Sequence, residues 1–239
     1  LPDFSRWGEV APVEWTAVRR LTAQSTATSW RVVPHVTQFD RADIRHVEAF
    51  LRSNAPKMEA QGIKLSLTAI VMKVCAMALV QFPRFNASVD PAHDRIIFKK
   101  YVHIGLAVDT ERGLLVPVVR NADRKSIGEL AAAIADLAAR ARSKKIKPDE
   151  MEGGSFTLSN QGGIGGTQFT PIVMWPQVAV LGMSRTRVEP VYVDGAFVPR
   201  SILPLALSYD HRIIDGADAA RFLRWVCEGL EMPLTLHLT

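Results

Sequence analysis

The sequence predicts one α/β domain in which helices dominate the first half and a mixed sheet is assembled largely from later segments. Apolar residues recur at helical spacing up to about residue 81, whereas the last third consists of short β-type runs between Gly- and Pro-rich turns. No internal repeat, low-complexity linker or break in composition divides the 239 residues, and the 48% of hydrophobic residues can fill one substantial core. We therefore expect residues 1–239 to form a single domain.

The composition excludes several classes of protein. A hydrophobic share of 48% with 22% charged residues is not that of a disordered chain. The two cysteines, Cys75 and Cys227, are too few for a disulfide framework or a structural zinc cluster, and both lie in apolar stretches, so we expect them to be reduced. The net charge of +5 favours an anionic partner. The basic residues are dispersed and lack interleaved aromatics, which argues against nucleic-acid binding.

Neither a membrane segment nor a targeting segment is expected. The longest apolar run, Leu65–Phe82, is interrupted by Lys73 and stopped by Pro83, so it falls short of the ~20 apolar residues of a spanning helix. The N-terminus has no signal-peptide pattern, and it begins at Leu1 without a methionine, which favours a piece of a longer protein. We expect a bacterial cytoplasmic protein, with the mitochondrial matrix as the alternative.

The first elements are predicted from capping residues and helical spacing. Residues 1–30 are expected to form an arm and one helix. A second helix should begin at about Asp40, where Asp40 and Asp43 are candidate caps for the apolar positions that follow. That helix should fade at Asn54–Pro56, and a further helical stretch to Gly62 stays open.

The middle of the chain is expected to combine one buried helix with hairpins. Leu65–Gln81 reads as a helix that is apolar on all sides, and residues 86–100 as strands around a turn at Asp90. The runs Val102–Val108 and Leu114–Val119 are separated by a polar turn that ends in glycine, which predicts a β-hairpin.

A capping box and an Ala-rich stretch predict the next helix. Ser126 and Glu129 can each satisfy a free backbone N–H, and the helix should continue through the basic stretch Arg140–Lys147 and stop before Pro148. The last helix is expected from about Asp218 to Leu230. The short β-type runs between these helices are Phe156–Ser159, Val178–Met183, Pro190–Val193 and Leu203–Ser208.

The glycine cluster Gly162–Gly166 has neither dinucleotide-binding spacing nor the Gly-Lys-Ser/Thr ending of a phosphate-binding loop. It is either a sharp loop after a strand or a loop that lets a substrate approach the backbone. No two histidines have ligand spacing with a carboxylate or a cysteine, so we expect no metal site. His35, after a proline, is expected to be a core or interface histidine.

His211 is the most informative histidine. It lies where an apolar strand ends, just before Gly216 and the start of a helix, and strand ends are where a rigid scaffold presents reactive side chains. Imidazole titrates near neutrality, so His211 is a candidate general base. Asp215 is placed to hold the turn or the start of the final helix. The residues alone leave a structural role for both open.

The stretch from His211 to Gly216 resembles the His-x-x-x-Asp-Gly signature of CoA-dependent acyltransferases, and with its flanking residues it resembles the dihydrolipoyl acyltransferase version. Further segments resemble the same family in the same order: Pro34–Thr37, Pro83–Asn86, Ile104–Thr110, Gly113–Val118, Phe156–Asn160 and Phe169–Val173. The resemblance covers nearly the whole chain and is closest to the catalytic domain of the acetyl type, which serves pyruvate dehydrogenase complexes. Trp175 departs from the family pattern at a position that could crowd the acyl or lipoyl site, so branched-chain and succinyl specificity stay open.

The resemblance implies a fold like that of chloramphenicol acetyltransferase, with two layers, a mixed sheet flanked by helices and an obligate homotrimer. It also implies that active sites lie between subunits, with His211 facing Ser159 of a neighbour. Trimers of this family assemble into 24-subunit cubes or 60-subunit dodecahedra. The alternating leucines of the C-terminus either make trimer-to-trimer contacts or are buried in the monomer; they are Leu234, Leu236 and Leu238.

The resemblance implies a reaction that moves an acetyl group from the thioester of S-acetyldihydrolipoamide to the thiol of CoA. His211 matches the base that takes the thiol proton, and Ser159 matches the hydroxyl donor for the oxyanion of the tetrahedral intermediate. Asp215 matches the signature carboxylate, and we expect it to hold the loop rather than to transfer a proton. Ser184 and Arg185 are candidate CoA contacts.

The implied partners lie mostly outside this chain. A lipoyl domain would present the lipoyl group, and pyruvate dehydrogenase and dihydrolipoyl dehydrogenase would bind through further domains; we expect the lipoyl and peripheral-subunit-binding domains upstream in a longer protein. Two alternatives stay open at this stage. One is a chloramphenicol-type O-acetyltransferase, which shares the histidine signature, and the other is an assembly scaffold without activity.

Overall fold

The computed structural model describes residues 1–111 and 113–232. The helices in these residues are α1 (Ala17–Val32), α2 (Arg45–Glu59), α3 (Leu67–Gln81), α4 (Ile127–Arg142) and α5 (Gly216–Glu231). The strands are β1 (His35–Asp43), β2 (Ala87–Asp90), β3 (Arg95–Phe98), β4 (Ile104–Thr110), β5 (Gly113–Leu115), β6 (Val118–Val119), β7 (Phe156–Asn160), β8 (Ala179–Met183), β9 (Arg187–Val193) and β10 (Ala196–Asp210).

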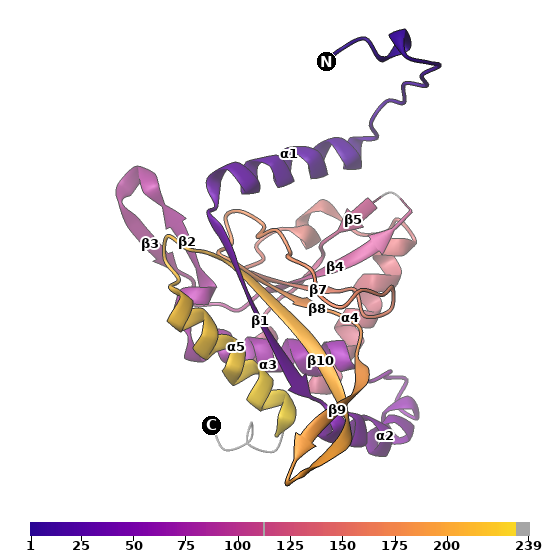
Figure 1. Ribbon diagram of the computed structural model, residues 1–239, viewed down its shortest axis with the longest axis vertical. Coiled ribbons are helices and arrows are strands. Elements are labelled where there is room, and N and C mark those ends of the chain that lie inside the picture. Colours follow the sequence, from indigo (N-terminus) through magenta and orange to yellow (C-terminus); the bar gives the residue numbers. More distant parts are fainter. Residues whose placement is uncertain (112, 233–239) are drawn as a thin grey trace.

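Eight of these strands form one mixed sheet with the order β1-β10-β8-β7-β4-β5, in which β6 also pairs with β4 and β9 with β10. The pairs β4–β7 and β7–β8 are parallel, and the other pairs are antiparallel. Helices α3, α4 and α5 pack together against the sheet, α1 lies apart from them near β5, and the β2–β3 hairpin projects from the body (Figure 1). The predicted mixed sheet flanked by helices is confirmed.

The centre of the core is α3, whose residues from Ala69 to Leu79 are almost all buried. The helix starts at the N-cap Ser66, whose hydroxyl accepts a hydrogen bond from the backbone N–H of Ala69 at 3.3 Å. The one charged side chain in it, Lys73, donates to the backbone carbonyls of Asp123 and Lys125 at 2.8 and 2.9 Å. A buried helix therefore tolerates this lysine because its ammonium group has protein acceptors.

The predicted start of the second helix is wrong. Asp40 lies in β1 and pairs with Leu205 of β10, and α2 begins only at Arg45. The Asp43 carboxylate still accepts a hydrogen bond from the backbone N–H of Arg45 at 3.2 Å, so one of the two expected caps acts near the helix start. The helix continues through Pro56 as far as Glu59 rather than fading before the proline. The sequence did not predict strand β1 because its pairing partner, β10, lies near the other end of the chain.

Two other elements differ in length from the prediction. Strand β10 has 15 residues, because its first half pairs with β9 in a hairpin and its second half lies between β1 and β8. Helix α4 keeps the predicted capping box of Ser126 and Glu129 but ends at Arg142, and only a short 3-10 turn follows at Pro148–Met151. The hairpin of β4 with β5 and β6 and the β2–β3 hairpin are present as predicted.

The two faces of the sheet differ in chemistry. Along β10, the large residues Leu205, Leu207 and Tyr209 belong to the core beneath the helices. Ala206 and Ser208 alternate with them and point to the opposite face. Because this second face carries small and hydroxyl-bearing side chains, it leaves space above the centre of the sheet, and the candidate site lies there.

Candidate active site

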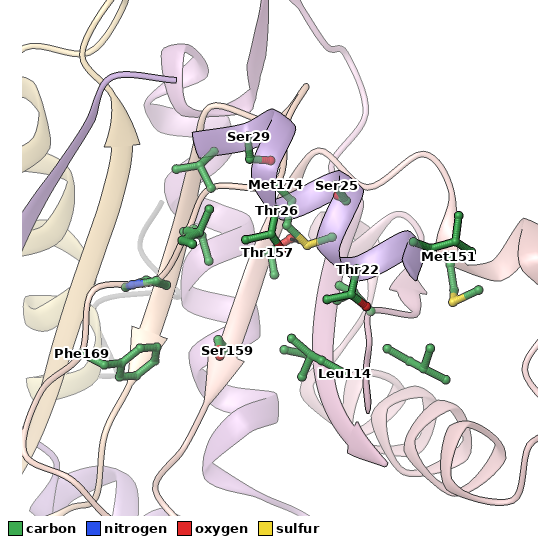
Figure 2. Close-up of a pocket in the computed structure, with 18 of the residues that line it drawn as sticks. Thr22, Ser25, Thr26, Ser29, Leu114, Met151, Thr157, Ser159, Phe169 and Met174 are labelled. Atoms are coloured by element: carbon green, nitrogen blue, oxygen red, sulfur yellow. Dashed lines mark hydrogen bonds between the residues drawn. The ribbon is translucent and has the colours of Figure 1, made fainter. Parts of the chain in front are cut away.

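Ser159 lies on the open face of the sheet, near the end of β7. The neighbouring Phe156 and Leu158 are in the core, while the half-buried Ser159 lines a pocket of about 530 Å³ (Figure 2). Thr157 points to the same side, but its hydroxyl donates to Gln177 Oε1 at 2.7 Å. Among the described residues, none hydrogen-bonds to the Ser159 hydroxyl. Ser159 therefore presents an available hydrogen-bond donor to whatever fills the pocket.

The pocket lies between α1 and the sheet, and its walls are mostly apolar with hydroxyl groups at intervals (Figure 2). Helix α1 supplies one wall, the β4–β5 hairpin another, and the loop before β8 a third. Their lining residues include Leu21, Thr22, Ser25, Ser29, Ala107, Leu114, Val116, Phe169, Ile172 and Met174. An apolar cavity of this size with a few polar groups is typical of a small-molecule site.

The ring of Phe169 is placed by a glycine on the neighbouring strand. A Cβ atom at Gly182 would lie 2.6 Å from the ring carbon Cζ of Phe169, closer than two carbons can approach. Gly182 is the partner of Ser159 in the β7–β8 ladder. The Phe169 ring therefore packs on the strand next to Ser159. A side chain at position 182 would displace the ring from the pocket wall.

The glycine cluster forms a sharp loop directly after β7. The backbone N–H of Gly162 donates to Asn160 Oδ1 at 2.8 Å, and Arg185 Nε donates to the Gly162 carbonyl at 3.3 Å. Gly165 and Gly166 have φ values of 148° and 80°, which side-chain-bearing residues rarely adopt. The interpretation as a sharp loop after a strand is confirmed, and the approach of a substrate to its backbone stays a prediction.

The two candidate CoA contacts have different environments. Arg185 is exposed and its side chain is hydrogen-bonded to the glycine loop, whereas Ser184 is only 4% exposed.

Trp175, which departs from the family pattern, does not line the pocket. The residue before it, Met174, does so, while Trp175 is 47% exposed. In the described chain, Trp175 therefore does not crowd the pocket at Ser159.

His211 follows β10 directly and is exposed. Its backbone N–H donates to the Pro34 carbonyl at 3.1 Å, and its ring centroid lies 5.8 Å from that of Tyr209. No described residue hydrogen-bonds to either ring nitrogen of His211. The imidazole is thus available for a hydrogen bond to a ligand.

His35 provides a contrast, because both of its ring nitrogens are engaged. Nδ1 lies 2.7 Å from the Val33 carbonyl, and Nε2 accepts a hydrogen bond from the backbone N–H of Val173 at 3.0 Å. The ring also stacks on Trp30 with 5.3 Å between centroids. His35 therefore joins the end of α1 to the loop before β8 and has a structural role.

Asp215 occupies the N-cap position of α5, but its carboxylate makes no capping hydrogen bond. The turn around His211 is held instead by a second carboxylate, that of Asp210, which is 1% exposed and paired with Arg212. Burial raises the pKa of the Tyr209 hydroxyl, and the nearby Asp215 charge raises it further. The sequence motif assigned no role to Asp210; the signal for this role is a carboxylate at the end of an apolar strand.

The described chain does not bring His211 and Ser159 together. Ser159 pairs with Gly182 of β8, and Gly182 pairs with Ala206 of β10. Since strand residues rise ~3.3 Å each and neighbouring strands lie ~4.8 Å apart, His211, beyond the end of β10, is more than ~15 Å from Ser159. A site that uses both side chains requires a second chain.

Several possible sites lack support in the described residues. Residues 1–111 and 113–232 contain no group of three or more His, Cys, Asp or Glu side chains that could hold a metal ion. None of the helices described has both the length and the apolar character needed to cross a bilayer. Burial raises the pKa of the Cys75 thiol to about 12, so Cys75 is an unreactive core residue.

Comparison with known proteins identifies relatives along almost the whole chain. Residues 8–238 match the family of 2-oxoacid dehydrogenases acyltransferase (catalytic domain). The chain is 51% identical over 236 residues to the dihydrolipoyllysine-residue acetyltransferase component of the pyruvate dehydrogenase complex of Pseudomonas aeruginosa, which covers 99% of this chain and 43% of that protein. The corresponding protein of Azotobacter vinelandii is 51% identical over 222 residues, covering 93% of this chain and 35% of that protein. The chain therefore spans less than half the length of these two relatives.

Solved structures agree with this relationship. Dihydrolipoamide acetyltransferase of Azotobacter vinelandii has a TM-score of 0.94 at 49% identity, covering 97% of this chain and 95% of that chain, and the cubic core of a pyruvate dehydrogenase multienzyme complex gives the same values. Chloramphenicol acetyltransferase has a TM-score of 0.54 at 16% identity, covering 87% of this chain and 94% of that chain, so it shares the fold, as predicted. The chain belongs to the catalytic-domain family of the 2-oxoacid dehydrogenase acyltransferases.

Proposed function

We propose that this chain transfers an acetyl group from S-acetyldihydrolipoamide to CoA. The observation that carries the proposal is the spacing of three residues. Ser159, His211 and Asp215 have the same spacing as the serine, histidine and asparagine whose roles in the catalytic mechanism were investigated in the Azotobacter vinelandii enzyme. Because the third residue of that enzyme is an asparagine, which does not titrate, the comparison supports a positioning role for Asp215 rather than a proton-transfer role.

In the proposed reaction, His211 takes the proton of the CoA thiol. A free thiol has a pKa of about 8.5, so a base increases the share of the nucleophilic thiolate near neutrality. The sulfur attacks the thioester carbonyl, and the Ser159 hydroxyl donates a hydrogen bond to the oxyanion that forms. Collapse of this intermediate breaks the bond to the dihydrolipoamide sulfur, which receives the proton from His211. Acetyl-CoA and dihydrolipoamide are released.

The proposed active unit is a homotrimer in which Ser159 of one subunit faces His211 of the next. The separation of the two side chains within one chain supports this arrangement. So does the N-terminal arm, which projects from the body and exposes the apolar side chains of Phe4, Trp7 and Trp15 (Figure 1). The similarity to the cubic core of a pyruvate dehydrogenase multienzyme complex favours the 24-subunit cube over the 60-subunit dodecahedron. The leucines considered for contacts between trimers lie at 233–239, outside the described residues.

The proposed partners follow from this role. The lipoyl group would be presented by a lipoyl domain outside this chain, CoA would be the second substrate, and no metal is used. Pyruvate dehydrogenase and dihydrolipoyl dehydrogenase would bind to other parts of a longer protein. The bacterial sources of the relatives support a location in the bacterial cytoplasm.

The test is a direct assay of acetyl transfer between acetyl-CoA and dihydrolipoamide by the assembled protein. Replacing the base, His211→Gln, should lower kcat by about 10²- to 10⁴-fold while the native mass and the circular dichroism spectrum stay unchanged. The matched control is His46→Gln, an exposed histidine on α2. Full activity of His211→Gln would remove His211 from the mechanism. Transfer to chloramphenicol but not to dihydrolipoamide would favour an O-acetyltransferase, and a wild type that transfers no acetyl group would favour a scaffold.

A further inference from the structure

Two side chains of opposite charge flank His211 and bind each other. Arg212 Nε donates to Asp210 Oδ1 at 2.9 Å and to Oδ2 at 3.1 Å, and Arg212 Nη2 donates to Oδ2 at 2.5 Å. The backbone N–H of Arg212 also donates to Asp210 Oδ1 at 3.0 Å. The exposed fractions are 1% for the Asp210 side chain and 31% for that of Arg212. A shielded fork of this kind is stronger and more rigid than a surface ion pair.

The backbone of the same turn is also fixed. The Asp210 carbonyl accepts hydrogen bonds from the N–H groups of Ile213 and Ile214, each at 3.2 Å. On the other side, His211 donates its own N–H to the Pro34 carbonyl at 3.1 Å. The main chain of His211 is therefore held between the ion pair and the connection from α1 to β1, while its imidazole has no hydrogen-bond partner within the described residues.

We propose that the Asp210–Arg212 ion pair is the positioning device of His211, and that its two charges, carried by the residues on either side of His211 in the chain, balance each other. The inference rests on the proposed function, because it takes His211 to be the base. Many histidine bases are oriented by a side chain that is hydrogen-bonded to the imidazole ring itself. In this chain the turn that carries the ring is oriented instead. Asp210 and Arg212 are positioning residues, since neither touches the reacting atoms.

The two charges act in opposite directions on the proton of His211. Removing the charge of Asp210 leaves an uncompensated cation on Arg212, the residue next to His211, which disfavours the protonated imidazole. Removing the charge of Arg212 leaves an anion, which favours it. The variants do not change the other titratable or charged groups on the elements around this turn: Tyr209, Asp215, Asp218 with its partners Arg84 and Arg221, and His35 of β1.

The experiment measures kcat and KM against pH for the assembled wild type, Asp210→Asn, Arg212→Gln and Arg212→Lys. In Asp210→Asn the acid limb of the kcat/KM profile should move to lower pH by about half to one pH unit, and in Arg212→Gln it should move to higher pH by a similar amount. Arg212→Lys keeps the cation but loses the fork, so its acid limb should stay in place. In all three variants kcat should fall by about tenfold or more with little change in KM, because the base is misplaced.

A second readout does not depend on turnover. Diethyl pyrocarbonate modifies the deprotonated imidazole, so the rate at which the peptide containing His211 is modified, followed by mass spectrometry against pH, should shift in the same two directions. The control is Glu189→Gln, which breaks the Arg41–Glu189 pair of 3.0 Å elsewhere on the sheet and should shift neither profile.

Opposite shifts in the two charge variants support the inference, and equal or absent shifts in variants with normal native mass overturn it. Should Asp210→Asn fail to assemble, the two Arg212 variants test the inference. The acid limb of the kcat/KM profile should then shift in Arg212→Gln and stay in place in Arg212→Lys. A wild type without acetyl transfer would overturn the proposed function alone, since the modification readout still reports on the ion pair.

Discussion

Two hydroxyl groups, those of Thr157 and Ser159, point to the same side of β7, but only one of them is available to a ligand. The Thr157 hydroxyl is committed to Gln177 Oε1 at 2.7 Å, whereas the Ser159 hydroxyl lies free at the pocket. A donor that has no partner in the resting protein can bond to a developing oxyanion without first breaking another bond. This difference is the reason that the proposed reaction uses the hydroxyl of Ser159 and leaves that of Thr157 to packing.

Replacing Ser159 with Ala should therefore act on the chemical step. We expect kcat to fall by about 10²- to 10³-fold and KM for both substrates to change little, because the lost hydrogen bond forms in the transition state. Steady-state kinetics of acetyl transfer check this. Ser53→Ala, at an exposed serine on α2 that donates to the Ala49 carbonyl, is the matched control. A rise in KM with unchanged kcat would instead assign Ser159 to substrate binding.

At the scale of single residues, the family-like segments of the sequence predict His211 and Ser159 as site residues because they match the family in residue type and in order along the chain. The motif could not reveal that Asp210 is buried and holds the turn, while Asp215 caps α5 without a side-chain hydrogen bond. Both are aspartates close to the histidine, and only the packing around each distinguishes them.

Among the elements, the β2–β3 hairpin is unusual because β3 exposes Ile96, Ile97 and Phe98. The hairpin is anchored at its base by Lys99, whose ammonium group donates to the Ala87 carbonyl at 2.8 Å and to Ser88 Oγ at 2.7 Å. Ser88 Oγ in turn donates to the Pro176 carbonyl at 2.5 Å, which links the hairpin to the loop before β8. Burial lowers the pKa of Lys99 from 10.5 to about 8.

This pKa predicts a pH dependence of stability. Between pH 8 and 10.5 the unfolded chain holds the Lys99 proton more often than the folded chain, so the contribution of Lys99 to stability rises with pH through this window and is absent below it. In denaturant unfolding, the wild type should therefore gain unfolding free energy relative to Lys99→Met as the pH rises, by up to about 3 kcal/mol. The exposed Lys100→Met should show no such trend, and a constant difference for Lys99→Met would contradict the prediction.

The helices and hairpins were largely predictable because their signals are local. The capping box of α4, the apolar run of α3 and the turn between β4 and β5 each lie within a short stretch of sequence. Strand β1 and the full length of β10 were not, because these strands are defined by pairing between residues near 40 and residues near 205. A polar stretch such as β1 becomes a strand only when a distant partner supplies the other half of the ladder.

For the whole molecule, the separation of Ser159 and His211 makes the proposed site depend on two chains. A strict test is complementation between Ser159→Ala and His211→Gln, each of which should be inactive alone. In a mixed trimer, one of the interfaces brings an intact serine to an intact histidine. Co-expressed subunits should therefore recover about a quarter of wild-type activity, whereas preformed homotrimers mixed without subunit exchange should recover none. Absence of recovery in confirmed mixed trimers would place both side chains in one subunit.

The position of β10 has a consequence for how the domain is made. It is the last strand of the sheet in chain order, yet it lies in the interior, between β1 and β8 (Figure 1). During synthesis, β1 emerges early and stays unpaired until residues 196–210 have left the ribosome. The pairing that completes the sheet is therefore a late event. The turn that carries His211, the proposed base, forms as this strand docks, so a nascent chain has this turn only when the sheet is complete.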